Sequence, residues 1–65
     1  MREHVKTEVA IEIISMMIAL AVKDNNREEI ERLNKEKESI YMGNEEIINK
    51  AYNEYSKIIK EKLGN

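Results

Sequence analysis

Apolar residues recur every three or four positions through three stretches of the chain, and short polar breaks separate the stretches. This spacing places the apolar residues of each stretch together on an α-helix. The breaks, at residues 24–26 and 43–44, are rich in Asn and contain one of the two Gly residues. The pattern predicts one all-α domain, residues 1–65, with helices over about 4–23, 27–42 and 45–63.

The first predicted helix is apolar over two neighbouring sides. One side holds Val9, Ile13, Met16, Met17 and Leu20. The next side holds Ala10, Ile11, Ile14, Ile18, Ala21 and Val22. An ordinary surface helix shows one apolar stripe, about 100° wide or somewhat more. The first helix is therefore expected to contact partners on both sides.

The two breaks carry recognisable helix-end signals. Asn26 followed by Glu29 resembles a capping box, with Asn at the N-cap and Glu three residues later. Gly43 suits a left-handed turn after the second helix, and Asn44 suits the N-cap of the third. Because the second junction is so short, we expect the second and third helices to form an antiparallel hairpin. The first helix would then fill the groove of that hairpin.

The second helix has only a narrow apolar stripe, and i,i+4 charge pairs such as Arg32 with Glu36 cover the rest. The third helix has a broad stripe, which includes Ile48, Tyr52, Tyr55 and Ile59. One side of the first helix can pack on these stripes. Its other side stays uncovered in a single chain.

The length of the chain makes self-association the expected way to cover that second side. A domain of 65 residues is marginal alone and usually needs a staple. The chain has no Cys, which excludes disulfides and zinc sites built on Cys. We therefore expect a homodimer or higher homo-oligomer, a helical bundle with this interface: Ala10, Ile11, Ile14, Met17, Ile18, Ala21 and Val22.

Another protein is the alternative occupant of that side. Met16 and Met17 lie in the region, and Met side chains adapt to varied partners. Packing in the core is the simpler role for both.

Nucleic acid is a disfavoured partner, because the formal net charge is -2. The third helix does offer a Lys face (Lys50, Lys57 and Lys60, with Asn49 and Asn53), and Tyr41, Tyr52 and Tyr55 could stack on bases. However, Tyr52 and Tyr55 fall on the stripe expected to be buried. The acidic start of the third helix also argues against a helix-turn-helix that reads DNA. A small dimeric nucleic-acid-binding regulator remains the alternative function.

No cofactor, metal or catalytic site is expected. His4, Glu8 and Glu12 would line up on one helix face, which can suit a metal, but an N-terminal polar stripe with acids near the positive helix end is the better explanation. The abundant Glu pairs lie on strongly hydrophilic faces, which are not the environment that acid–base catalysis requires. The apolar stretch 9–22 is too short to span a membrane and contains Glu12. We therefore expect a cytoplasmic protein that is not an enzyme.

The run from Ile13 to Val22, the charged segment 28–38 and the Gly43-Asn44 junction together resemble a group of small helical proteins of unknown function. Such proteins are carried by conjugative transposons and phages of low-GC Gram-positive bacteria. The resemblance implies no activity, but it favours an accessory protein that works by binding. The expected function is that of a non-catalytic, oligomeric helical module for protein interaction or regulation.

Overall fold

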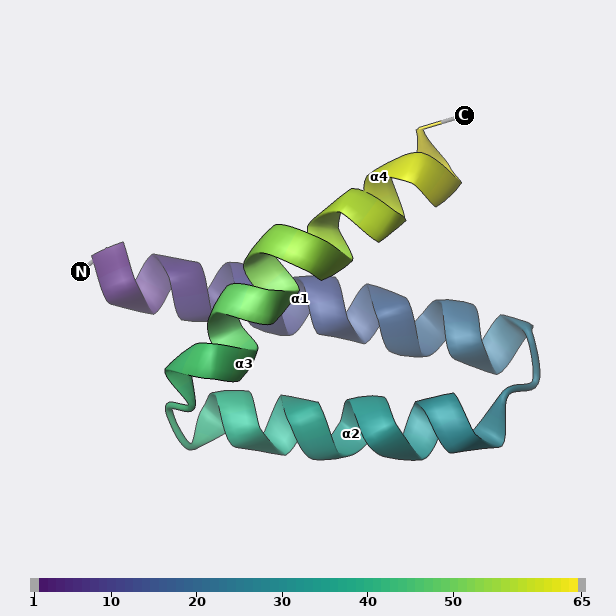
Figure 1. Ribbon diagram of the computed structural model, residues 1–65, viewed down its shortest axis with the longest axis horizontal. Helices are drawn as coiled ribbons and strands as arrows, with labels where there is room; N and C mark the ends of the chain where they lie inside the picture. The colour runs from purple at the N-terminus through teal and green to yellow at the C-terminus, as the bar shows by residue number, and fades with distance from the viewer. Residues whose placement is uncertain (1, 65) are drawn as a thin grey trace.

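The computed structural model describes the backbone of residues 2–64 and the side chains of residues 5–64, and three helices account for nearly all of this part. The first two are α1 (Arg2–Lys23) and α2 (Arg27–Tyr41). The third helix is continuous but changes its hydrogen bonding, and it consists of α3 (Glu45–Lys50), η1 (Ala51–Tyr55) and α4 (Ser56–Leu63). Figure 1 shows their arrangement. The predicted all-α class with three helices is confirmed.

Both breaks are turns in which one residue adopts the left-handed conformation. Asn25 has φ 59° and Gly43 has φ 87°. In each turn the next residue donates its N–H back to a carbonyl five positions earlier, from Asn26 to Ala21 at 2.9 Å and from Asn44 to Ser39 at 3.0 Å. This is the Schellman pattern, which satisfies carbonyls that a helix end leaves unpaired.

The residues after each turn cap the helix that follows. The Asn26 Oδ1 atom accepts from the Glu29 N–H at 3.3 Å, as the capping-box pattern predicts. The Asn44 Oδ1 atom accepts from the N–H groups of Glu46 at 3.1 Å and Ile47 at 3.3 Å. These bonds satisfy N–H groups at the helix starts that would otherwise lack a partner. The local signals therefore fix where the helices begin and end.

The helices do not pack in the predicted order. Figure 1 shows α1 and α2 side by side and antiparallel, and the third helix crosses α1 diagonally. The hairpin is thus formed by the first and second helices, and the expectation of a hairpin between the second and third is wrong. The backbone of the third helix lies close to α2 only near its own start, and α4 then runs away from α2 beyond α1. A turn of two or three residues permits a wide range of angles, so its brevity alone does not impose a hairpin.

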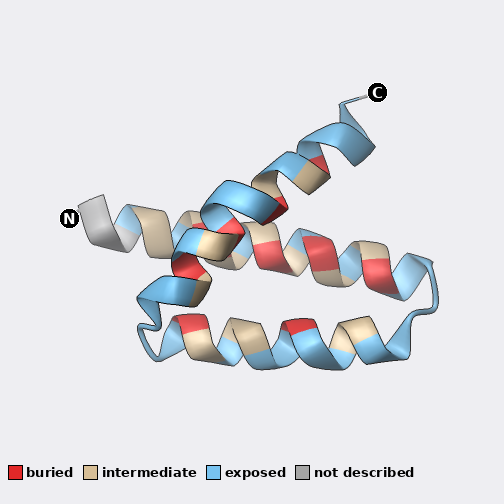
Figure 2. Ribbon diagram, in the orientation of Figure 1, coloured by how far each residue is buried: buried red, intermediate tan, exposed pale blue. Residues whose placement is uncertain are grey.

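The core lies where α1, α2 and the third helix face one another, as Figure 2 shows. Its buried residues are Ala10, Ile14, Met17, Ala21, Leu33, Ile40, Ile48, Ala51, Tyr55 and Ile59. Small side chains let crossing helices approach closely, and Ala10 and Ala51 are both fully buried on the two helices that cross. The side of α1 that faces this core is therefore the one carrying Ala10 and Ile14, which the helical wheel had placed outside. That assignment of sides is corrected.

A wide turn interrupts the third helix at Ala51–Tyr55. The Ser56 N–H donates to the Ala51 carbonyl, five residues back, instead of the carbonyl four residues back. The Ser56 hydroxyl donates to that nearer carbonyl, on Tyr52. Ser side chains that bond back in this way compete with the helical ladder and bend helices. The substitution of a side-chain donor for a backbone donor explains locally why the turn widens here.

Candidate interaction surfaces

Two rows of apolar residues run along α1, one residue out of step with each other. The inner row is Ala10, Ile14, Met17 and Ala21. The outer row is Val9, Ile13, Met16 and Leu20. Both rows have the spacing four, three, four. A step of one residue turns about 100° around a helix, so the two rows look in clearly different directions.

The inner row is used within the chain. Ala10 and Ile14 are fully buried, Ala21 is 5% exposed and Met17 is 9% exposed. These four residues belong to the set predicted at an oligomer interface, and the core of a single chain already accounts for their apolar character. Of the other three, Ile11 and Ile18 pack against the core and are half-buried, whereas Val22 is exposed. The oligomer interface thus stays a prediction, and most of its residues are buried or half-buried within the single chain.

The outer row is only partly covered by its own chain. Met16 is 47% exposed, and Val9, Ile13 and Leu20 are half-buried. Val5, one turn before Val9, is also exposed. Among the described residues this apolar run is open at Val5 and Met16 and half-covered elsewhere, because Ile13 and Leu20 also pack against the core.

A polar cluster ties the third helix to α2 on the other side of the molecule. This Tyr55 cluster consists of Tyr55, Glu29, Arg32, Glu36 and Lys50. The Tyr55 hydroxyl accepts from the Arg32 guanidinium at 2.9 Å and donates to the Glu36 carboxylate at 2.6 Å. Arg32 also pairs with Glu36 at 2.9 Å and with Glu29 at 2.7 Å. Of the predicted i,i+4 pairs, that of Arg32 with Glu36 is therefore present.

The charges of the cluster stabilise one another. The hydrogen bond from Arg32 lowers the pKa of the Glu29 carboxyl below its ordinary value, despite slight desolvation. The neighbouring Tyr55 and the negative charge of Glu36 raise the pKa of Lys50, whose ammonium lies 5.5 Å from the Tyr55 ring centroid. Within the described residues no buried side-chain polar atom lacks a partner. The cluster is thus satisfied, which fits a structural contact better than a reactive site.

The Lys face predicted on the third helix is divided by its contacts. Lys6 of α1 donates to Asn49, and its ammonium lies 5.4 Å from the Tyr52 ring centroid. Lys50 pairs with Glu36 at 3.5 Å. Tyr55 is buried as predicted, but Tyr52 is 44% exposed, so its expected burial is wrong. Two of the five residues of the Lys face, Asn49 and Lys50, are thus engaged in contacts with other helices.

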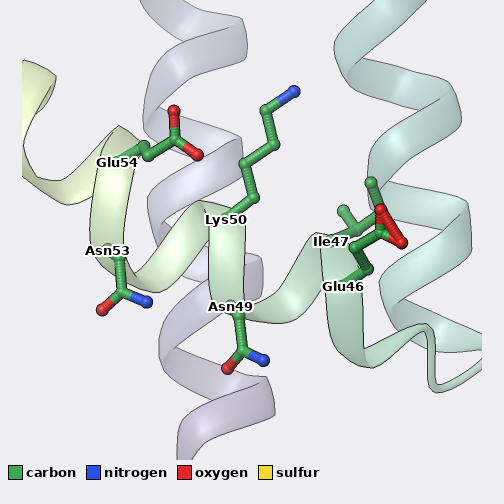
Figure 3. A pocket seen from close by; sticks show the side chains of 6 residues that line it. All are labelled: Glu46, Ile47, Asn49, Lys50, Asn53 and Glu54. Carbon is green, nitrogen blue, oxygen red and sulfur yellow. The ribbon is translucent and has the colours of Figure 1, made fainter.

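Shallow hollows lie along the third helix, and Asn53 lines two of them. The hollow in Figure 3 is lined by Glu46, Ile47, Asn49, Lys50, Asn53 and Glu54. In this view the side chains of Asn49 and Asn53 point one way and those of Lys50 and Glu54 the other, so these four polar side chains do not converge on one point. The second hollow is lined by Tyr52, Asn53, Ser56, Lys57, Ile59 and Lys60. It is the more basic of the two and holds an aromatic ring.

The metal hypothesis gains no support from the described part of the chain. Within it, no three His, Asp or Glu side chains gather closely enough to hold an ion. Glu8 and Glu12 are both exposed, and the side chain of His4 lies outside the described residues. Over the same part of the chain, none of the helices has the length and hydrophobicity that a membrane span requires.

The chain as a whole exposes more surface than its mass requires. Its accessible surface is 5144 Å², whereas a folded monomer of 7.7 kDa typically has about 4,300 Å². The excess is about 800 Å² by that scaling. The flat shape contributes to it, since the principal extents are 35 × 26 × 14 Å.

Comparisons with family models, with functionally described proteins and with solved structures find no match.

Proposed function

We propose that the chain is a non-catalytic helical module that works by binding protein, and that its first partner is its own copy. The observation that carries this proposal is the excess accessible surface together with the open apolar run on α1. A standard protein interface buries about 800 Å² on each partner, which is close to the excess on this chain. Homodimers with twofold symmetry are the commonest way to cover such a surface.

The rest of the molecule supports a binding role rather than a reaction. The polar groups of the Tyr55 cluster are paired with one another, and the hollows on the third helix are shallow. The resemblance to small accessory proteins of mobile elements also fits a role in binding. We propose a cytoplasmic location as part of the same account, because a chain without Cys suits a reducing compartment.

Solution mass tests the proposed function. Light scattering behind a sizing column, over a wide range of concentration, is expected to give a defined dimer or higher oligomer. A chain that stays monomeric and fully helical at every concentration would remove self-association from the account, and a different protein would then be the partner to seek.

A second candidate function is binding of single-stranded nucleic acid at the basic hollow. The observation in its favour is the exposed Tyr52 ring in the same hollow as Lys57 and Lys60, since stacking beside cationic groups is how such strands are bound. Binding of a labelled oligonucleotide should then weaken steeply as salt rises. The variant Tyr52→Ala should weaken it further, whereas Tyr41→Ala, at an exposed ring on α2, should not. An absence of binding at low salt would remove this candidate.

A further inference from the structure

We propose that the outer row of α1 (Val9, Ile13, Met16 and Leu20) is the seam along which two copies of the chain associate, each covering the outer row of the other. This inference rests on the proposed self-association and says which side of the molecule carries it. It replaces the side expected from the sequence, most of which the chain buries by itself.

The spacing of the outer row is that of a coiled-coil seam. Steps of four, three and four residues match alternating a and d positions of a heptad. Side chains so placed insert as knobs into holes on a facing helix that has the same spacing. A twofold interface requires one patch to complement itself, and a row of this kind does so. A second copy is therefore an occupant that brings a row of matching spacing.

The ends of the row limit the seam to these four residues. Lys6 precedes Val9 by three positions and Lys23 follows Leu20 by three, so both fall on the same heptad positions. A charged side chain at such a position is costly inside a seam and fixes its register. Lys6 already donates to Asn49 and lies over the Tyr52 ring, both on the third helix. Exposed Glu12 lies beside the row and would stay at its wet edge.

The amount of surface fits a second copy. Val5 and Met16 are exposed on this side of α1, and Val9, Ile13 and Leu20 are partly exposed. The surface excess of the whole chain, about 800 Å², is close to what each partner buries in a standard interface. One twofold contact would thus bring the exposed area of each chain close to the value typical for its mass.

The opposite edge of α1 makes a poorer seam. Ile11 and Ile18 pack against the core, as Ile13 and Leu20 of the outer row also do. The difference between the two edges is Ser15, which interrupts the apolar line from Ile11 through Ile18 to Val22. Val22 is 57% exposed, slightly more than Met16, but it has no continuous apolar row around it. This contrast supplies a matched control, because Met16 and Val22 are exposed side chains of the same helix.

The experiment compares Met16→Glu with Val22→Glu and the unchanged chain, by light scattering with circular dichroism as a check on helicity. We expect the unchanged chain and Val22→Glu to dimerise alike. Met16→Glu should raise the dissociation constant of the dimer by about 100-fold or more, because each chain would bury an unpaired carboxylate. Should Met16→Glu lose helicity, Met16→Gln serves in its place, with an expected weakening of about tenfold.

The outcomes separate this inference from the function on which it rests. If the unchanged chain is oligomeric and Met16→Glu or a folded Met16→Gln keeps its mass, the seam is elsewhere and the inference is overturned, while self-association stands. The same holds if Val22→Glu is the variant that dissociates. If the unchanged chain is monomeric at all concentrations, the proposed self-association fails, and the seam fails with it.

Discussion

The inner and outer rows of α1 have the same spacing and similar hydrophobicity, yet the fold treats them differently. The inner row ends at small residues, Ala10 and Ala21, and is closed over by α2 and the third helix. The outer row has the same Ile and Met at its middle positions but ends at the larger Val9 and Leu20, and it is left half open. The comparison teaches that side-chain size, and not hydrophobicity alone, selects which side of an apolar helix packs within the chain. Small residues permit the close crossing of helices, while larger ones remain available for a looser seam.

The largest effect is expected from truncation of the inner row. Ile14 is fully buried, so Ile14→Ala should destabilise the fold by about 2–5 kcal/mol, which is comparable to the whole stability that one small core supplies. Loss of helicity at 25 °C, followed by circular dichroism, would show it.

The matched change in the outer row is Met16→Ala. At protein concentrations low enough to leave the chains dissociated, it should cost less than about 1 kcal/mol, because much of the side chain is already in water. Urea melts of the two variants under the same conditions make the comparison. Equal losses at the two positions would contradict the distinction between the rows.

A middle-sized effect is expected from the contact that holds the third helix in place over the inner row. Tyr55→Phe removes the hydroxyl between Arg32 and Glu36, and leaves Glu36 with one donor fewer at a site where its side chain is 13% exposed. The free energy of unfolding should fall by about 1–2 kcal/mol. Tyr41→Phe is the control, because Tyr41 is 66% exposed, and it should have almost no effect. Equal melts for the two variants would show that the cluster adds nothing to the fold.

The sequence predicts the helices well, because their ends depend on local chemistry. The left-handed Gly43 and the caps at Asn26 and Asn44 are each determined by a few neighbouring residues. The choice of inner row could not be made from a helical wheel, since Ile13 and Ile14 are equivalent in hydrophobicity. The signal that could have found it is the small size of Ala10 and Ala21, since small residues on one side of a helix favour close packing there.

The Tyr55 cluster was only half visible in the sequence. Arg32 and Glu36 are four residues apart and form a predictable helical pair. Tyr55 joins them from 23 positions away, and this contact exists only because the third helix crosses α1 as it does. The wide turn at Ala51–Tyr55 has no reliable sequence signal either, although Ser56 is the residue that accompanies it. Features that depend on tertiary placement are thus the ones that periodicity misses.

A smaller effect is expected where the third helix begins. Asn44→Ala removes the side-chain oxygen that accepts from two N–H groups, and should cost about 1 kcal/mol. The third helix would then be held less firmly over the inner row, and hydrogen exchange in Glu45–Lys50 should quicken first. Asn34→Ala is the control, since Asn34 is exposed within α2 and Ala is the better helix former. Unchanged exchange near Asn44 would argue against the cap.

The smallest effect concerns pH. The pKa of Glu29 is lowered in the folded chain by its hydrogen bond with Arg32, so its contribution is fully present above its ordinary pKa of about 4.3. That contribution is lost as the pH falls through the lower, folded-state pKa. Because the pair is exposed, the gain is small, and salt should reduce it. In urea melts, the free energy of unfolding of Glu29→Gln should fall less between pH 7 and pH 3 than that of the unchanged chain. Glu28→Gln, at an exposed neighbour on α2, is the matched control. Identical pH profiles for Glu29→Gln and the unchanged chain would show that the pair of Glu29 with Arg32 does not contribute to stability.

The most direct test of the central claim is the mass of the unchanged chain in solution by sedimentation equilibrium, from dilute to concentrated protein. If the outer row is covered by a second copy, the mass should rise to about twice the 7.7 kDa of one chain, and the melting temperature should rise with concentration. A mass of 7.7 kDa at every concentration, with native helicity retained, would contradict the account, because the open side of α1 would then have no copy to cover it.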